Sequence, residues 1–500
     1  MFRLGRFLYH FRRQTAITIP VLLALVAGTA AANTLWLPEG GEVLRGVRIW
    51  FDSPSCEEID DYGYWQSFAR QNKYGLLCLD NTVPRTRSAV QTVLNDYAND
   101  TGHPELSHVP FVAIGFSWSS GYSVAVSRAI PERCVALVPS GISVGGDDEL
   151  YKIPLIKILH EGNGLEQGFE DVNAARAHGA LWGGDPRYNG FHKWANNAMM
   201  VLLFYDYCNR YRVPLTENAV DGPVTLRDFR EEEGWIIPRD RKFKSYCPTV
   251  AAVGAYDGQR NNDQWFPSEY IAKVSRSYNV FNDGLYDSTK WEFYDHWLFG
   301  PYYHEPTTPS LRMIYPSSAP SQKSPNVASY GRESHLLAEY TGSADVEEVV
   351  IYDGDMPLKR FESGPYSFMA KLAPGYHGIY AEALLADGSR IISGLGVVLI
   401  RRPDNIETRI VRPPPGDRPL VGTDLVLEAE AVTDEGTISR VEFFVDGQSV
   451  GEDTEAPYQV TWNADAAGGR VISAKVFSDG GDSSEAFPIK LAVVEPSVLT

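Results

Sequence analysis

The stretch that decides the fold of this chain is Val109-Pro-Phe-Val-Ala-Ile-Gly-Phe-Ser117-Trp-Ser-Ser-Gly121. An apolar run ends in Gly115-x-Ser117-x-Ser119, and small, helix-compatible residues follow as far as Ala129. A serine on a tight turn between a strand and a helix has its hydroxyl lifted out of the sheet. Small neighbours are needed because the turn brings the two backbones close together, and Ser119 stands where a second glycine is usual. The pattern indicates Ser117 as a nucleophile.

Strands and helices alternate on both sides of this turn. Continuous apolar runs predict strands at 47–51, 74–79, 110–114 and 134–138, and helical patterns are found at 59–71 and 86–97. Buried strands separated by helices indicate a parallel sheet that is covered on both faces. Residues 145–244 break this rhythm, so we expect a cap insertion there, before strands resume at 248–253 and 290–294.

The N-terminus has the pattern of an export signal. Several arginines precede the apolar segment 16–27, and three alanines at 30–32 close it. We therefore expect a signal peptide over residues 1–32 and a secreted, periplasmic or cell-surface protein. An uncleaved membrane anchor is the alternative.

Charge and cysteine content narrow the possible partners. The formal net charge of -19 argues against nucleic acid and against anionic membranes, since both require a basic surface. No Cys/His spacing resembles a zinc site, so we expect no metal and no cofactor. The five cysteines are odd in number, which leaves at least one thiol unpaired. We expect Cys78 and Cys134 to be buried thiols in strands, and Cys208 to pair with Cys247.

The C-terminal part of the chain repeats itself. After a Pro- and Ser-rich linker at 306–330, three dipeptides of the 331–402 segment recur in the 420–500 segment, at offsets that subtraction gives as 93, 92 and 92 residues. Alternating strands with Asp-Gly turns predict a small β-sandwich for each copy, joined by a linker at 403–419. The second copy, from Gly436 to Trp462, resembles bacterial immunoglobulin-like domains, and we expect two such domains.

Residues 46–301 resemble the α/β-hydrolase superfamily. The match is to esterase-like members whose turn reads Gly-Phe-Ser-x-Gly-Gly, where this chain has Gly115-Phe-Ser117-Trp-Ser-Ser. The resemblance implies an α/β fold with a doubly wound sheet over residues 33–305, interrupted by the cap at 145–244. It also implies a catalytic triad in the chain order serine, acid, histidine.

A serine hydroxyl needs an adjacent base, and that base needs an orienting carboxylate. Asp257 follows the expected strand 248–253, and His296 follows the expected strand 290–294. These positions predict Ser117 as nucleophile, His296 as general base and Asp257 as the acid. Asp263 and His304 are the alternatives for the last two roles.

An oxyanion hole needs two N–H donors. We expect one from Trp118 and the second from Asp52 or Ser53, after the strand 47–51, because Pro54 has no N–H. No glycine stands in this loop, and an ionised Asp52 near a developing oxyanion would oppose catalysis.

These observations favour an exported serine hydrolase that cleaves carboxylic esters through an acyl-enzyme, with acyl or aryl esters on polysaccharides as the expected substrates. A catalytically inactive surface, adhesion or glycan-binding protein of the same fold is the main alternative. A peptidase of this fold is a further one.

Overall fold

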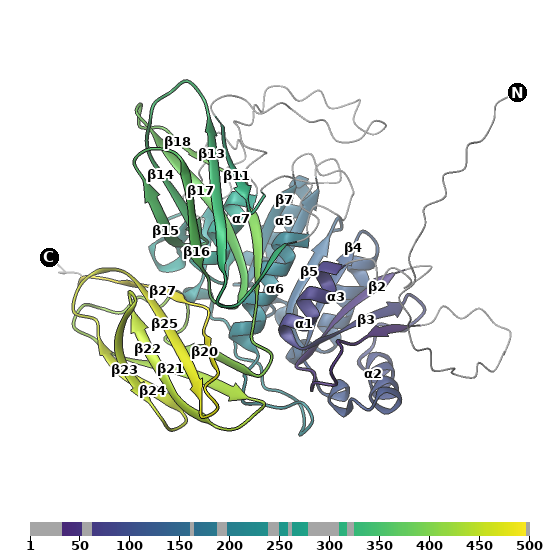
Figure 1. The fold of residues 1–500 in the computed structure, drawn as a ribbon. Helices are drawn as coiled ribbons and strands as arrows, with labels where there is room; N and C mark the ends of the chain where they lie inside the picture. The colour runs from purple at the N-terminus through teal and green to yellow at the C-terminus, as the bar shows by residue number, and fades with distance from the viewer. Residues whose placement is uncertain are drawn as a thin grey trace, which may run out of the picture.

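A computed structural model describes residues 33–52, 63–160, 165–187, 198–238, 250–258, 263–278, 310–317 and 325–496. The predicted signal peptide at 1–32 and the predicted strand at 290–294 lie outside these residues. Within the described ranges, no helix is both long enough and apolar enough to span a membrane. Figure 1 shows a mixed helix-and-strand unit beside two β-sandwiches.

A seven-stranded sheet forms the centre of the N-terminal unit. Its order is β1-β3-β2-β4-β5-β6-β7, with β1 antiparallel to β3 and the other neighbours parallel. The four strands predicted before residue 145 are confirmed as β2 to β5. The strands are β1 (Thr34–Trp36), β2 (Gly46–Asp52), β3 (Tyr74–Asp80), β4 (Phe111–Phe116), β5 (Cys134–Ser140), β6 (Leu155–His160) and β7 (Trp182–Arg187).

Helices connect these strands. The chain moves from β2 to β3 in one direction along the sheet and from β4 to β5 in the other. Because crossovers between parallel strands are right-handed, α1 and α3 cover opposite faces. The helices predicted at 59–71 and 86–97 are confirmed as α1 and α2. The helices are α1 (Gly63–Asn72), α2 (Arg87–Thr101), α3 (Ser119–Ala129), α4 (Asp148–Tyr151), α5 (Leu165–Arg176), α6 (Ala198–Arg212) and α7 (Glu269–Tyr278), with short 3₁₀ turns η2 (Pro104–Ser107), η3 (Pro131–Arg133), η5 (Glu231–Glu233) and η6 (Val253–Ala255).

The predicted cap at 145–244 is wrong for much of its length. Its first part contains β6, α5 and β7, which extend the central sheet instead of leaving it. The polar Lys157 in β6 is buried because it pairs with Asp171 of α5. The predicted strand 248–253 is also misplaced. It is β9 (Ala251–Ala252), which belongs to a separate antiparallel sheet with β8 (Trp235–Pro238) and β10 (Asp263–Phe266).

Two β-sandwiches follow, as the sequence repeat predicts. The first pairs a three-stranded sheet, β11-β13-β16, with a six-stranded one, and the second pairs β20-β21-β24 with a five-stranded one. The strands of the first are β11 (Ser310–Tyr315), β12 (Asn326–Ser329), β13 (Glu333–Thr341), β14 (Val346–Asp353), β15 (Met356–Phe361), β16 (Tyr366–Lys371), β17 (Gly375–Leu385), β18 (Arg390–Ile392) and β19 (Gly396–Arg401). Those of the second are β20 (Ile406–Arg412), β21 (Asp424–Thr433), β22 (Ile438–Val445), β23 (Gln448–Asp453), β24 (Tyr458–Asn463), β25 (Gly468–Ser478), β26 (Ser483–Glu485) and β27 (Ile489–Val493).

The two expected linkers contain strands of the sandwiches. β11 and β12 fall within 306–330, and β20 falls within 403–419. Proline and serine mark these segments in the sequence, but their apolar residues, such as Leu311 and Ile406, are buried in the sandwich cores. Each sandwich therefore begins earlier in the chain than the composition indicates.

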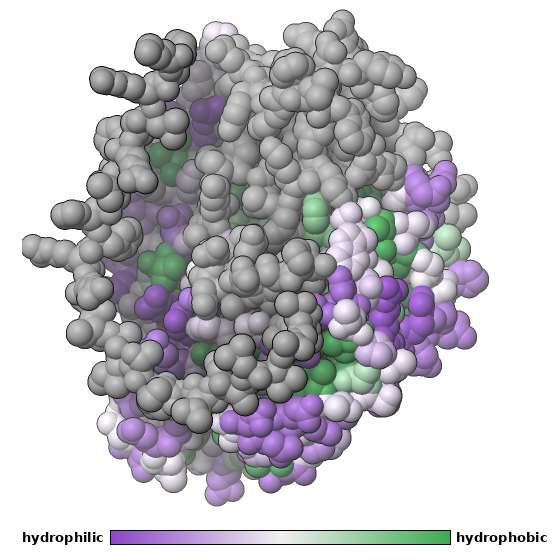
Figure 2. All heavy atoms as spheres, turned by 90° about the vertical axis from the view of Figure 1, so that its right-hand side faces the viewer, coloured by the Kyte–Doolittle hydropathy of each residue, from purple (hydrophilic) through white to green (hydrophobic). Residues whose placement is uncertain are grey.

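Helix α6 joins the first sandwich to the central sheet. One side of the helix contacts β5 and the other contacts β17, and α7 also contacts β17. Almost every residue of α6 is buried, as expected of a helix that is covered all round. Figure 2 shows another side of the molecule, where the described residues expose small apolar areas separated by hydrophilic ones.

The expected pairing of the cysteines is wrong. Cys208 lies in α6 as a free, buried thiol, and Cys134 is also free and buried. Cys78 forms a disulfide instead of being a buried thiol.

Candidate active site

The turn between β4 and α3 holds Ser117 in a conformation that side chains rarely adopt. Its φ is 56°, in the left-handed region, where a residue other than glycine is strained. A hydrogen bond from the Ser117 N–H to the Ser140 carbonyl (2.8 Å) and one from the Ser120 N–H to the Ser117 carbonyl (3.0 Å) hold the turn in place. Strand, strained serine and helix are the features predicted from the sequence.

Gly115 allows β4 and α3 to approach each other. A Cβ atom at this position would lie 2.6 Å from the Ser119 carbonyl oxygen and 2.6 Å from the Ser120 nitrogen. Both are backbone atoms, which cannot swing away as the end of a side chain can. Gly115 is therefore required because a side chain at this position would collide with the backbone of Ser119 and Ser120, and not because of its own φ.

Ser119 takes the place of the usual second glycine and stabilises the turn. Its hydroxyl accepts a hydrogen bond from the Phe116 N–H (2.9 Å) and donates one to the Phe116 carbonyl (2.8 Å). The hydroxyl of the fully buried Ser120 is used in a similar way, on the backbone of Ser140 in β5. Both hydroxyls are occupied within the fold, so neither competes with Ser117. The Ser117 hydroxyl is half-buried and makes no hydrogen bond to another described residue.

The strand order places Ser117 where parallel sheets bind ligands. From β2 the chain continues to β3 on one side, and β4 lies on the other side of β2. The point at which the chain reverses direction opens a crevice at the carboxyl ends of the strands. Ser117 follows the carboxyl end of β4, and Asp52 ends the adjacent strand β2.

One predicted oxyanion donor lies at the start of a helix. Trp118 directly precedes α3 and has helical backbone angles (φ -58°, ψ -29°). The N–H groups at a helix N-terminus have no partner within the helix and attract negative charge. Asp52 is the last residue of β2 rather than part of the loop after the strand, and Ser53 lies outside the described residues.

Neither of the two carboxylates proposed from the sequence belongs to the central sheet. Asp257 is exposed and follows β9 and η6, which are not part of the central sheet. That small sheet contacts the central one through β10 and β7, and three strand spacings of about 4.8 Å separate β7 from β4. The alternative, Asp263, is buried in β10 and paired with Arg176 (3.0 Å). His296 and His304 lie outside the described residues.

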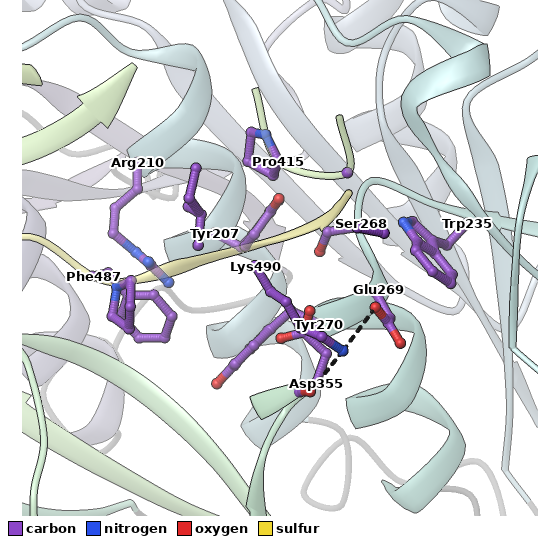
Figure 3. Close-up of a pocket in the computed structure, with 14 residues that line it drawn as sticks. Tyr207, Arg210, Trp235, Ser268, Glu269, Tyr270, Asp355, Pro415, Phe487 and Lys490 are labelled. Carbon is purple, nitrogen blue, oxygen red and sulfur yellow. Dashed lines mark hydrogen bonds and ion pairs between the residues drawn. The ribbon is translucent and has the colours of Figure 1, made fainter. Parts of the chain in front are cut away.

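A cluster of charged residues that the sequence analysis missed lies where the three units meet. Figure 3 shows this pocket, with Lys490 pointing between Glu269 and Asp355. The Lys490 ammonium group lies 3.3 Å from the Glu269 carboxylate and 3.2 Å from the Asp355 carbonyl oxygen. Burial, followed by repulsion from Glu269, raises the pKa of Asp355 to about 7. The residues of this cluster come from units that are far apart in the sequence. No local sequence pattern therefore indicates the cluster.

Among the described residues, no group of three or more His, Cys, Asp or Glu side chains is arranged to hold a metal ion.

Comparison with solved structures gives distant matches. The fibronectin(III)-like modules of Clostridium thermocellum CbhA are 26% identical, over 38% of this chain and 97% of that one, with a TM-score of 0.18. The Bacteroides ovatus mixed-linkage glucan utilization protein SGBP-B, solved with a mixed-linkage heptasaccharide, is 11% identical over 38% and 46%, with a TM-score of 0.21. MGS-MChE2, an α/β hydrolase enzyme from the metagenome of lagoon sediments of Mar Chica, Morocco, is 14% identical over 27% and 74%, with a TM-score of 0.18.

The strand order of the central sheet defines the fold of the N-terminal unit. No curated protein matches the chain. Residues 407–474 match the family model of the bacterial Ig domain, which covers most of the second sandwich.

Proposed function

We propose that this protein is a serine hydrolase that cleaves carboxylic esters, with Ser117 as the nucleophile. The observation that carries the proposal is the left-handed φ of 56° at Ser117, between a parallel strand and the N-terminus of a helix. Strain of this kind in a residue other than glycine is concentrated at functional sites. The Ser117 oxygen attacks the ester carbonyl, the alcohol leaves, and water releases the acid from the acyl-enzyme.

The start of α3 supplies the electrostatic part of the mechanism. The Trp118 N–H lies beside the nucleophile, at the positive end of the helix. It would donate a hydrogen bond to the oxygen that becomes negative in the tetrahedral intermediate. We assign the second donor to a backbone N–H at the end of β2, whose last residue is Asp52.

The strand order changes our proposal for the base and the acid. Beyond β4, the central sheet continues through β5, β6 and β7, and parallel strands present their carboxyl ends at one edge. Glu161 is the first residue after β6, and His192 is the first histidine after β7. These two residues keep the order serine, acid, histidine. Both residues lie outside the described residues. The proposal is therefore supported by the positions of β6 and β7, the strands that precede them. The pair Asp257 and His296 is the alternative.

The setting supports export and a glycan-linked substrate. A disulfide at Cys78 suits an oxidising compartment, where such bonds persist. The second sandwich matches a bacterial Ig domain. We therefore propose that the esters are acyl or aryl groups on polysaccharides. A peptidase has no comparable support.

Hydrolysis of 4-nitrophenyl acetate by the wild type and by Ser117→Ala tests the nucleophile. We expect Ser117→Ala to lower kcat by at least about 1000-fold, because the remaining groups cannot replace a covalent step. A fluorophosphonate probe should attach to the peptide that contains Ser117, and to Ser117 rather than Ser119. A folded wild type that neither turns over the ester nor takes up the probe would refute the proposal and favour the inactive, glycan-binding alternative.

Three histidine variants identify the base. We expect His192→Ala to lower kcat about as much as Ser117→Ala does, since residues of a catalytic triad act as a unit. His296→Ala and His304→Ala should retain most of the activity. Loss of activity in His296→Ala alone would restore the assignment made from the sequence.

A further inference from the structure

An aromatic and cationic wall stands beside the proposed nucleophile, formed by Trp118, Tyr122 and Arg85. Trp118 directly follows Ser117 and is 47% exposed. Its indole packs edge-on against the Tyr122 ring, with the centroids 5.2 Å apart. Tyr122 lies in the first turns of α3 and also packs on Phe51 at the end of β2 (5.1 Å). The wall therefore lies at the carboxyl ends of β2 and β4.

Arg85 completes this wall with a positive charge. Its guanidinium carbon lies 3.4 Å from the centre of the Tyr122 ring. At that distance the guanidinium plane stacks on the ring, and its N–H groups point outward in a plane parallel to the ring. Arg85 is exposed and forms no ion pair with a described residue. Arg87, by contrast, forms a two-bond pair with Glu132.

The loop that carries Arg85 is fixed at both ends. On one side, the Asp80 carboxylate accepts a hydrogen bond from the Thr82 N–H (2.8 Å), and the Asp80 carbonyl accepts one from Val83 (3.0 Å). On the other side, Thr86 caps α2 by accepting from the Ala89 N–H. A cation held by its backbone and by a stacked ring loses little freedom when it binds an anion.

An exposed arginine without an ion pair among the described residues is informative because the chain is strongly acidic. The protein has 64 acidic and 45 basic residues, a balance that repels anions in general. A planar guanidinium binds carboxylates with two parallel hydrogen bonds. An exposed indole beside it offers a surface for the neighbouring apolar part of a ligand.

We propose that the wall of Trp118, Tyr122 and Arg85 is the subsite that selects esters carrying a carboxylate near the scissile bond. Arg85 binds the carboxylate, and Trp118 packs against the carbon chain or ring that links it to the ester. The proposal rests on the proposed function, because it places this subsite beside Ser117. It makes acidic esters, rather than neutral ones, the preferred substrates.

Two esters matched in length test the selection. Mono-4-nitrophenyl glutarate carries the carboxylate, 4-nitrophenyl pentanoate lacks it, and both release the same product. The readout is the ratio of kcat/KM for the acidic ester to that for the neutral one. We expect Arg85→Gln to lower this ratio about 10-fold, because a charge-assisted hydrogen bond at a partly exposed site contributes on the order of 1.5 kcal/mol. Arg85→Lys should restore part of it.

Arg87→Gln is the matched control, since Arg87 is exposed, close in sequence and already paired. The ratio of kcat/KM values measured for Arg87→Gln should equal that of the wild type. Added salt should lower the ratio of the wild type and leave that of Arg85→Gln nearly constant. An equal ratio in wild type and Arg85→Gln would overturn the proposal.

Binding without turnover separates this proposal from the proposed function. Saturation-transfer NMR of monomethyl glutarate and methyl pentanoate on Ser117→Ala needs no catalysis. We expect the acidic ester to bind more tightly, and Arg85→Gln in the same background to abolish the difference. If the wild type hydrolyses neither nitrophenyl ester, this measurement still decides whether the wall binds carboxylates, and equal binding of the two methyl esters would refute it.

Discussion

Phe487 lies where the three units of the chain meet, so its removal tests whether they are stable only together. Its side chain is 8% exposed. The ring stacks on His377 of the first sandwich, with centroids 4.8 Å apart, and meets Tyr270 of α7 edge-on at 5.5 Å. The Arg210 guanidinium of α6 lies 3.7 Å from the ring centre. The ring therefore contacts both other units from its own place in the second sandwich.

Phe487→Ala should lower the free energy of unfolding by about 3 to 5 kcal/mol. That range is typical of a buried phenylalanine and already includes the ring pairs and the cation–π contact. Because these contacts cross between units, most of the loss falls on their association. Urea unfolding followed by tryptophan fluorescence measures the free energy of unfolding. Hydrogen exchange of the amides in α7 and β17 shows whether these elements lose stability. We expect exchange in both elements to rise, although neither belongs to the unit that carries the substitution.

Phe477→Ala is the control for this experiment. Phe477 is half-buried in the same sandwich, beneath the Arg440 guanidinium (3.8 Å). Its removal should destabilise that sandwich and leave exchange in α7 and β17 unchanged. If Phe487→Ala gives the same exchange pattern as Phe477→Ala, the ring does not join the units and the reasoning fails.

Three further predictions follow from single contacts. Gly115→Ala should abolish soluble expression or probe labelling at Ser117, because the added carbon lies 2.6 Å from backbone atoms; full labelling would contradict the contact. Asp355, whose pKa is raised from 3.8 to about 7, keeps its proton in the native state while the unfolded chain ionises, so stability should fall between about pH 4 and pH 7. Asp355→Asn should flatten this slope in a series of thermal unfolding curves, and an unchanged slope would exclude the carboxyl group. Cys134 and Cys208 are buried, and burial raises both pKa values, that of Cys134 to about 12. Neither should react with a thiol reagent until the protein unfolds, and rapid reaction in the native state would contradict their burial.

The sequence reveals the centre of the sheet because its pattern there is uniform. β3 and β5 are apolar along most of their length, and every residue in them is buried. The turn at Ser117 is equally readable, since glycine and small residues are required at fixed positions around it. Local rules and tertiary contacts agree at this point of the chain.

β6 and β7 were missed because tertiary contacts override their local pattern. Lys157 interrupts β6 and is tolerated only through its ion pair with Asp171. β7 contains Gly183 and Gly184, which resemble a loop in sequence. A Cβ at Gly183 would lie 2.6 Å from the Trp265 carbonyl oxygen, so the glycine makes room for β10. Without the partner segments, neither strand can be recognised from the sequence.

The burial of α6 on two sides limits how this protein can be shortened. A chain cut after residue 305 would keep every strand of the central sheet but would lose β17, which covers the outer side of that helix. Side chains such as Tyr205 and Phe204 pack in a core that also includes Tyr376 and Val397 of the first sandwich. Removing the sandwich would expose part of that core to water and favour self-association. Attempts to express the N-terminal unit should therefore retain the first sandwich, which serves as part of its interior and not as an appended module.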